Sequence, residues 1–219
     1  MHYGGSPSEM AARDYGVDLY WLPLGAGGHS VRFNGRVYET LVAALEHRVR
    51  CDLYHSALEI LVPDGRYIIE MASIPDGDGF ARGVVAEGAV GSRIIGAFRL
   101  FRYEVRCWRG GTIPDVGEAV DSPQRLTSDL DVANRILELV REVPTHVWGR
   151  DPLGAHDMWN SNSLTSWLLV GAGLDVSAAT LPINGRAPGW EAGVTAAQAD
   201  MSEVDGFHRV RAPTAVLTR

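Results

Sequence analysis

In the first half of the chain, apolar and polar residues alternate with the two-residue period of a half-buried strand. Residues 29–39 follow this pattern around Asn34-Gly35, a pair that favours tight hairpins because both positions tolerate positive φ. Residues 52–72 contain two further apolar runs on either side of a Pro-Asp-Gly turn. The pattern therefore predicts two hairpins, with a short helix over residues 40–48 between them.

The middle of the chain combines loop-like segments with one long strand. Residues 75–91 are rich in Gly and Asp, which is typical of a loop. The apolar run that follows alternates with Arg102, Glu104 and Arg106, so we predict a long strand with one water-facing side. Residues 112–127 are predicted to form a second loop.

The second half of the chain carries the spacing of helices. Ser128 precedes apolar residues at helical spacing, and Pro144 ends that run. Asn160 is a suitable N-cap for a second apolar-striped helix, which Gly171-Ala172-Gly173 would end. Strands followed by helices indicate an α+β fold in which an antiparallel sheet packs against helices.

At 219 residues, the chain is expected to form a single domain spanning residues 1–219. Residues 1–16 are expected to be a flexible N-terminus. Residues 174–219 are rich in Gly, Ala and Pro and read as an extension of the same domain, with weak strand signals near Val210 and at residues 215–217.

Composition and charge narrow the possible partners. The formal net charge of −7, with arginines scattered along the chain, argues against nucleic acid because nucleic-acid binders cluster basic residues against phosphates. No stretch approaches the ~20 apolar residues needed for a membrane span, and the N-terminal residues lack the pattern of a signal peptide. We therefore expect a cytoplasmic protein that acts on or binds a small molecule, a lipid or a peptide.

Cysteine and histidine usage gives no sign of a metal centre. Cys51 and Cys107 are too few for a disulfide framework, and each lies in an apolar, strand-like stretch typical of a core residue. The seven histidines show neither an H-E-x-x-H motif nor close pairing with carboxylates. We expect no metal and no cofactor.

The residues most suggestive of chemistry are Ser161, His55 and Glu70. Ser161 lies in the first turn of the helix that Asn160 caps, where free backbone N–H groups and the helix dipole stabilise developing negative charge. A serine nucleophile needs a positioned base. His55 begins a half-polar strand and is the best candidate for that base, and Glu70 on the returning strand is placed to orient its ring.

These residues resemble a known family. His55-Ser-Ala-Leu-Glu-Ile, Asp64-Gly65, Tyr67-Ile-Ile-Glu70 and Asn160-Ser161-Asn162-Ser163-Leu164 look like the circularly permuted, papain-like NlpC/P60 superfamily, in particular its lecithin retinol acyltransferase-like branch. The resemblance implies a permuted papain-like fold and an acyl hydrolase or acyltransferase acting on an ester, thioester or amide. In it, His55 corresponds to the general base, Glu70 to the residue that orients it and Ser161 to the nucleophilic cysteine.

Serine in place of that cysteine leaves three interpretations: a native serine hydrolase, an inactive descendant, or an engineered replacement. Two other functions also fit the sequence. In the first, Ser161 only caps its helix and the domain binds a lipid or peptide without catalysis. In the second, Cys51 or Cys107 is the nucleophile.

The remaining candidate residues are assigned to substrate binding. His29 follows a run of glycines, which permits close approach of a ligand to the backbone. His156 lies just before the proposed nucleophile, and Trp190 lies in a turn-rich segment suited to covering a cleft. Asn160 and Trp159 precede Ser161 directly. Loop, cap and core roles are the structural alternatives for each of these side chains.

Overall fold

The computed structural model describes residues 15–24, 52–73, 83–94, 96 and 101–211, with the side chains of 204–211 excepted. The predicted hairpin at residues 29–39 and the predicted helix at 40–48 lie outside these ranges. Gly16, the last residue of the expected flexible N-terminus, is instead the first residue of a strand.

Within the described ranges, the chain builds one seven-stranded sheet in the order β4-β5-β3-β2-β1-β6, with β7 paired to β2. All neighbouring strands run antiparallel except β2 and β7. The strands are β1 (Gly16–Pro23), β2 (Asp52–Val62), β3 (Gly65–Ser73), β4 (Val84–Ala89), β5 (Arg102–Arg109), β6 (Val120–Thr127) and β7 (Gly185–Arg186). The hairpin predicted over residues 52–72 is confirmed as β2 and β3.

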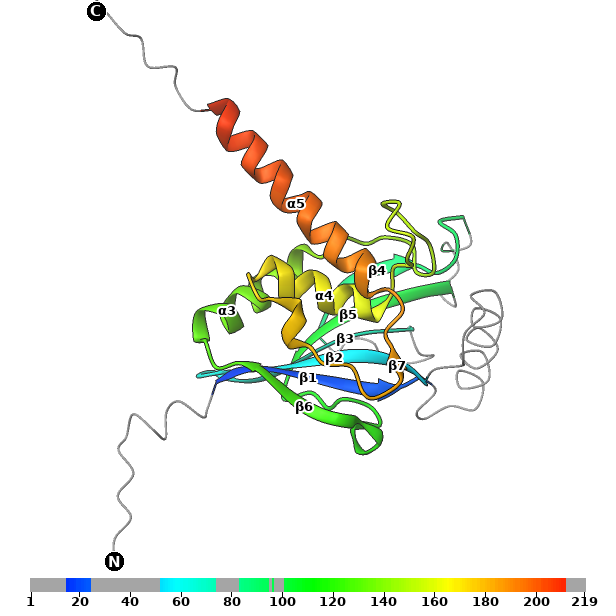
Figure 1. The fold of residues 1–219 in the computed structure, drawn as a ribbon, viewed down its shortest axis with the longest axis vertical. Coiled ribbons are helices and arrows are strands. Elements are labelled where there is room, and N and C mark those ends of the chain that lie inside the picture. Colours follow the sequence, from blue (N-terminus) through cyan, green and yellow to red (C-terminus); the bar gives the residue numbers. More distant parts are fainter. Residues whose placement is uncertain (1–14, 25–51, 74–82, 95, 97–100, 212–219) are drawn as a thin grey trace, which may run out of the picture.

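Helices α3 and α4 run along one side of this sheet, and α5 packs on α4 and extends away from it (Figure 1). Both helices predicted from the spacing of apolar residues are confirmed as α3 and α4. The helical elements are η4 (Val116–Glu118), α3 (Leu130–Leu139), η5 (Val140–Glu142), α4 (Ser161–Gly171), η6 (Val176–Ala178) and α5 (Trp190–Arg211). The described elements thus form an α+β fold; none of their helices is both long and apolar enough to cross a membrane.

The two faces of the sheet carry separate cores. Residues directly opposite each other in antiparallel strands point to the same face. Trp21 pairs with Ser56, and Leu22 pairs with His55. Trp21 belongs to the large core shared with the helices, whereas Leu22 belongs to a small cluster that includes Ile113. We call the side covered by α3 and α4 the helix face and the opposite side the far face.

Four of these strands, β1, β4, β6 and the two-residue β7, were not predicted from the sequence. The prediction of a loop over residues 75–91 is wrong where β4 pairs with β5, and the prediction over 112–127 is wrong where β6 pairs with β1. Both are edge strands of the sheet, so each is hydrogen-bonded to only one neighbouring strand. An edge strand is less buried and does not need a continuous apolar run. β1 was not assigned because residues on both of its faces are buried, which removes the alternating pattern.

The C-terminal prediction is also corrected. Val210 belongs to helix α5 and not to a strand. Helices α4 and α5 pack closely because small residues, Ala192 and Gly193, lie in the first turn of α5. A Cβ atom at Gly193 would lie 2.1 Å from both the Ser163 carbonyl oxygen and the Ser166 hydroxyl. Only glycine fits this crossing without a shift of α5.

The water-facing side predicted for β5 is wrong. Glu104 and Arg106 are only 2% and 5% exposed, and both lie on the far face. They are buried because Arg106 pairs with Glu104 and with Glu70 of β3. Charged side chains become compatible with burial when they are paired and hydrogen-bonded.

Candidate functional site

The first turn of α4 is built as a capping box. The side-chain oxygen of Asn160 accepts hydrogen bonds from the backbone N–H groups of Asn162 at 2.8 Å and of Ser163 at 3.4 Å. In return, the Ser163 hydroxyl accepts from the Asn160 N–H at 3.0 Å. Asn160 therefore has the predicted role of N-cap, and its amide occupies the N–H groups that would otherwise be available to a ligand.

The same turn fastens α4 to strand β2 of the sheet. Asn162, which is 1% exposed, donates from its side-chain nitrogen to the Tyr54 carbonyl at 2.9 Å. The Ser56 hydroxyl lies 2.9 Å from both the Asn162 side-chain oxygen and the Thr165 hydroxyl. Ser56 is thus the β2 side chain that meets the helix start.

The turn also holds the segment that leads into α5. The side-chain nitrogens of Asn160 and Asn162 both donate to the Pro188 carbonyl, at 2.7 and 2.8 Å. The Ser163 hydroxyl donates to the Gly189 carbonyl at 2.7 Å. A Cβ at Gly189 would lie 2.2 Å from the Asn160 side chain, so this contact requires glycine.

Asp157 caps the start of α5. Its carboxylate oxygens each lie 2.8 Å from the Gly189 N–H, and one also accepts from the Glu191 N–H at 3.2 Å. A carboxylate at this position also interacts favourably with the positive end of the α5 helix dipole. The polar residues from 157 to 166 therefore connect the starts of both helices.

Ser161 lies inside this turn and is 5% exposed. Among the described residues, no side chain or backbone group forms a hydrogen bond with its hydroxyl. The next two backbone N–H groups of the helix donate to Asn160. The Asn160 side chain thus occupies two of the backbone N–H groups that the expected oxyanion site would use.

His55 lies on the far face, away from α4. Its neighbours Tyr54 and Ser56 point into the helix-face core and toward α4, and side chains alternate along a strand. Burial lowers the pKa of His55 to about 4, against a smaller opposing effect of Asp115. The structure does not bring His55 and Ser161 together, and His55 is neutral at neutral pH.

Glu70 shares the far face with His55, as its predicted orienting role would require. Its carboxylate accepts a hydrogen bond from Arg106 at 2.7 Å and is 9% exposed. Arg106 bridges Glu70 and Glu104 in a buried ionic cluster. The sequence alone does not predict this cluster, because its members come from two strands. Its one sequence signal is the recurrence of Glu and Arg at alternate positions of β5.

Two of the other predicted binding residues, His156 and Trp159, have loop and core positions. His29 lies outside the described residues. His156 is exposed with a φ of 58°, and its backbone N–H donates to Asp151 at 2.9 Å. Trp159 is fully buried, with its ring 4.9 Å from that of His146. The structure thus assigns His156 to an exposed loop position and Trp159 to the core.

Trp190 opens α5 and is half-buried. Its ring centroid lies 5.4 Å from that of Trp21, which belongs to the helix-face core. The Trp21 indole N–H donates in turn to the Thr180 carbonyl at 2.9 Å. Trp190 therefore packs against the helix-face core, which is the structural alternative to its predicted binding role.

Cys107 does not have the environment of a nucleophile. Burial raises the pKa of its thiol to about 11, so the thiol is protonated at neutral pH. Cys51 lies outside the described residues. In the part of the chain that is described, no group of three His, Cys, Asp or Glu side chains is arranged to hold a metal ion.

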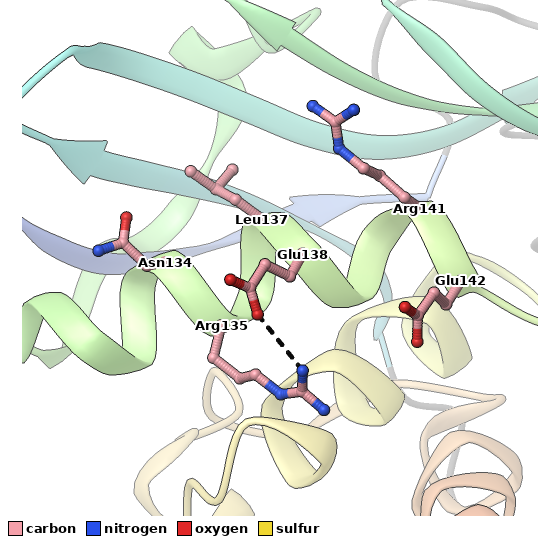
Figure 2. Close-up of a pocket in the computed structure, with 6 residues that line it drawn as sticks. All are labelled: Asn134, Arg135, Leu137, Glu138, Arg141 and Glu142. Atoms are coloured by element: carbon pink, nitrogen blue, oxygen red, sulfur yellow. Dashed lines mark hydrogen bonds and ion pairs between the residues drawn. The ribbon is translucent and has the colours of Figure 1, made fainter.

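A shallow hollow lies over the outer surface of α3 and η5. Figure 2 shows Arg135 and Glu138 facing each other across one turn, with a 3.4 Å ion pair between them. Its lining mixes both signs of charge and is formed by Asn134, Arg135, Leu137, Glu138, Arg141 and Glu142. Arg135 and Glu138 are half or more exposed, so this surface resembles an ordinary solvated helix.

Fold and site together define a class: an α+β domain with a mostly antiparallel sheet and helices on one face. No family model, curated protein or solved structure matches this chain.

Proposed function

We propose that this chain is a non-catalytic domain that binds a lipid or a peptide, in which Ser161 has a structural role at the start of α4. One observation carries the proposal: the backbone N–H groups of Asn162 and Ser163 in that turn are already bonded to the Asn160 side chain, at 2.8 and 3.4 Å. Stabilisation of an oxyanion requires free donors at the position where charge develops.

The positions of the two expected partners support the same conclusion. Ser161 follows the N-cap of a helix on the helix face, whereas His55 is opposite Leu22 on the far face. A general base must come within ~3.2 Å of the proton it removes, directly or through one water. Two side chains on opposite faces of a sheet cannot come this close, so the arrangement does not support an acyl hydrolase based on this pair.

Labelling with a fluorophosphonate tests the proposal, because an activated serine reacts with it and a buried structural serine does not. We expect no labelling of the wild type or of Ser161→Ala, and equal background turnover of ester and amide probes by both. Labelling of the wild type that Ser161→Ala abolishes would overturn the proposal in favour of the acyl hydrolase.

A further inference from the structure

The segment between η6 and α5, drawn in orange in Figure 1, contains a tight turn over residues 182–185. The Gly185 N–H donates to the Pro182 carbonyl at 2.8 Å, and this hydrogen bond closes the turn. Asn184 occupies the third position of the turn with a φ of 59°. A turn with positive φ at this position favours glycine or asparagine there, so the backbone of Asn184 suits the turn.

Hydrogen bonds and strand pairing anchor this segment on both sides of the turn. Before the turn, the Thr180 N–H donates to the Gln124 side chain at 3.1 Å, and the Gln124 side-chain nitrogen donates to the Thr180 carbonyl at 2.7 Å. After the turn, β7 pairs in parallel with the first residues of β2. A Cβ atom at Gly185 would lie 2.8 Å from the Tyr54 ring, so this position requires glycine.

An asparagine that is followed by glycine can modify itself. The backbone nitrogen of the glycine loses its proton and attacks Cγ, the side-chain carbonyl carbon of the asparagine. The bond between Cγ and Nδ2 then breaks, ammonia leaves with that proton, and a cyclic succinimide remains. Water opens the succinimide at either carbonyl and gives aspartate or isoaspartate. Glycine is the least hindered neighbour for this reaction because it has no side chain.

The folded turn presents the Asn184 side chain but withholds the attacking nitrogen. Asn184 is exposed, and its side chain hydrogen-bonds to no other described residue. The proton on the Gly185 nitrogen, in contrast, is hydrogen-bonded to the Pro182 carbonyl, and Gly185 pairs with Asp52 of β2. Because the nitrogen must lose this proton before it attacks Cγ, the turn has to open first.

We propose that Asn184 is a self-modification site that reacts only when the turn at residues 182–185 opens. Conversion to aspartate places a carboxylate directly before Gly185, which pairs with the exposed residue Asp52. Conversion to isoaspartate lengthens the main chain and disturbs the register of β7 against β2. Each product disfavours reclosure, so the modification records how often this segment opens. The inference does not depend on the proposed function.

Peptide mapping by mass spectrometry measures how fast Asn184 is converted in the full chain at mildly alkaline pH. The folded chain is compared with the same chain unfolded in urea at the same pH and temperature. We expect conversion to be at least about tenfold slower in the folded chain, because opening breaks the turn hydrogen bond and the pairing of β7. Equal rates in the two states, or no conversion in urea, would overturn the proposal.

A variant that loosens the anchored segment tests the role of opening. Gln124→Ala removes both hydrogen bonds to Thr180 and should speed conversion in the folded chain about fivefold. Gln198→Ala is the matched control, because it removes the same kind of side chain from α5, and it should convert at the wild-type rate. No increase for Gln124→Ala, or equal increases for both variants, would contradict control by opening. Thermal unfolding verifies that each variant keeps its fold.

Discussion

The helix face and the far face of the sheet are stabilised in different ways. On the helix face, a large apolar core is joined by neutral hydroxyl and amide groups such as Ser56 and Asn162, which hydrogen-bond to each other. On the far face, the apolar cluster is small, and charged pairs surround it. Arg125 donates two hydrogen bonds to the Asp18 carboxylate, of 2.6 and 2.9 Å. Arg106 forms ion pairs with two buried carboxylates.

The difference matters for what a single substitution does. Removing one partner from a neutral pair leaves a polar group that costs ~1–3 kcal/mol to bury. Removing one partner from a buried ionic pair leaves a charge, at a cost of ~3–5 kcal/mol. The far face should therefore be the more sensitive of the two wherever its charges are buried.

The largest effect is expected for Arg106→Met, which removes the guanidinium between Glu70 and Glu104. Because the side chains of both glutamates are less than a tenth exposed, the free energy of unfolding should fall by ~3–5 kcal/mol in urea titration. Arg135→Met is the control, since the side chains of its ion pair with Glu138 are 51% and 69% exposed, and should cost no more than ~1 kcal/mol. Equal losses would show that burial does not separate the two ion pairs.

The second effect concerns His55 and pH. Its folded-state pKa of about 4 lies below the ordinary value of 6.5, so the unfolded chain binds the proton more tightly. Stability from this group is fully present above pH 6.5 and is lost as the pH falls toward 4, by at most ~3 kcal/mol.

Urea unfolding at a series of pH values measures this contribution as the difference between the wild type and His55→Asn. The variant should show a shallower decline between pH 6.5 and 4, because it lacks the titrating ring. Parallel curves for the two proteins would mean that His55 is accessible enough to protonate in the folded state.

The smallest effects sharpen the picture of the helix face. Asn162→Ala removes bonds to the Tyr54 and Pro188 carbonyls and should lower the free energy of unfolding by ~2 kcal/mol. Ser161→Ala, one residue away and also buried, should change it by less than ~0.5 kcal/mol. A larger loss for Ser161→Ala in urea titration would reveal a bond that the described contacts do not contain.

Features with local causes were predictable from the sequence. Asn160 caps α4 as expected, because its side chain bonds to N–H groups two and three residues later. The hairpin of β2 and β3 followed from alternation around a three-residue turn signal. In contrast, β4 and β6 depend on pairing with strands that are distant in sequence, and no short window contains that information.

The candidate site shows the same limit. Alternation along β2 separates His55 from Tyr54 and Ser56, but only the packing of α4 decides which set faces the helix. The sequence pattern is equally compatible with either side. A shift of β2 by one residue would exchange its two faces and turn His55 toward α4. The observed register, in which Leu22 pairs with His55, places His55 on the far face instead.

The first turn of α4 bonds to chain segments that are made at very different times. Tyr54 and Ser56 leave the ribosome long before Asn162, whereas Pro188 and Gly189 follow more than twenty residues later. Until those last residues emerge, the side-chain nitrogen of Asn160 lacks its acceptor, and that of Asn162 has only the Tyr54 carbonyl. A nascent chain that stops before residue 188 would therefore leave side-chain donors in the first turn of α4 without their acceptor on Pro188.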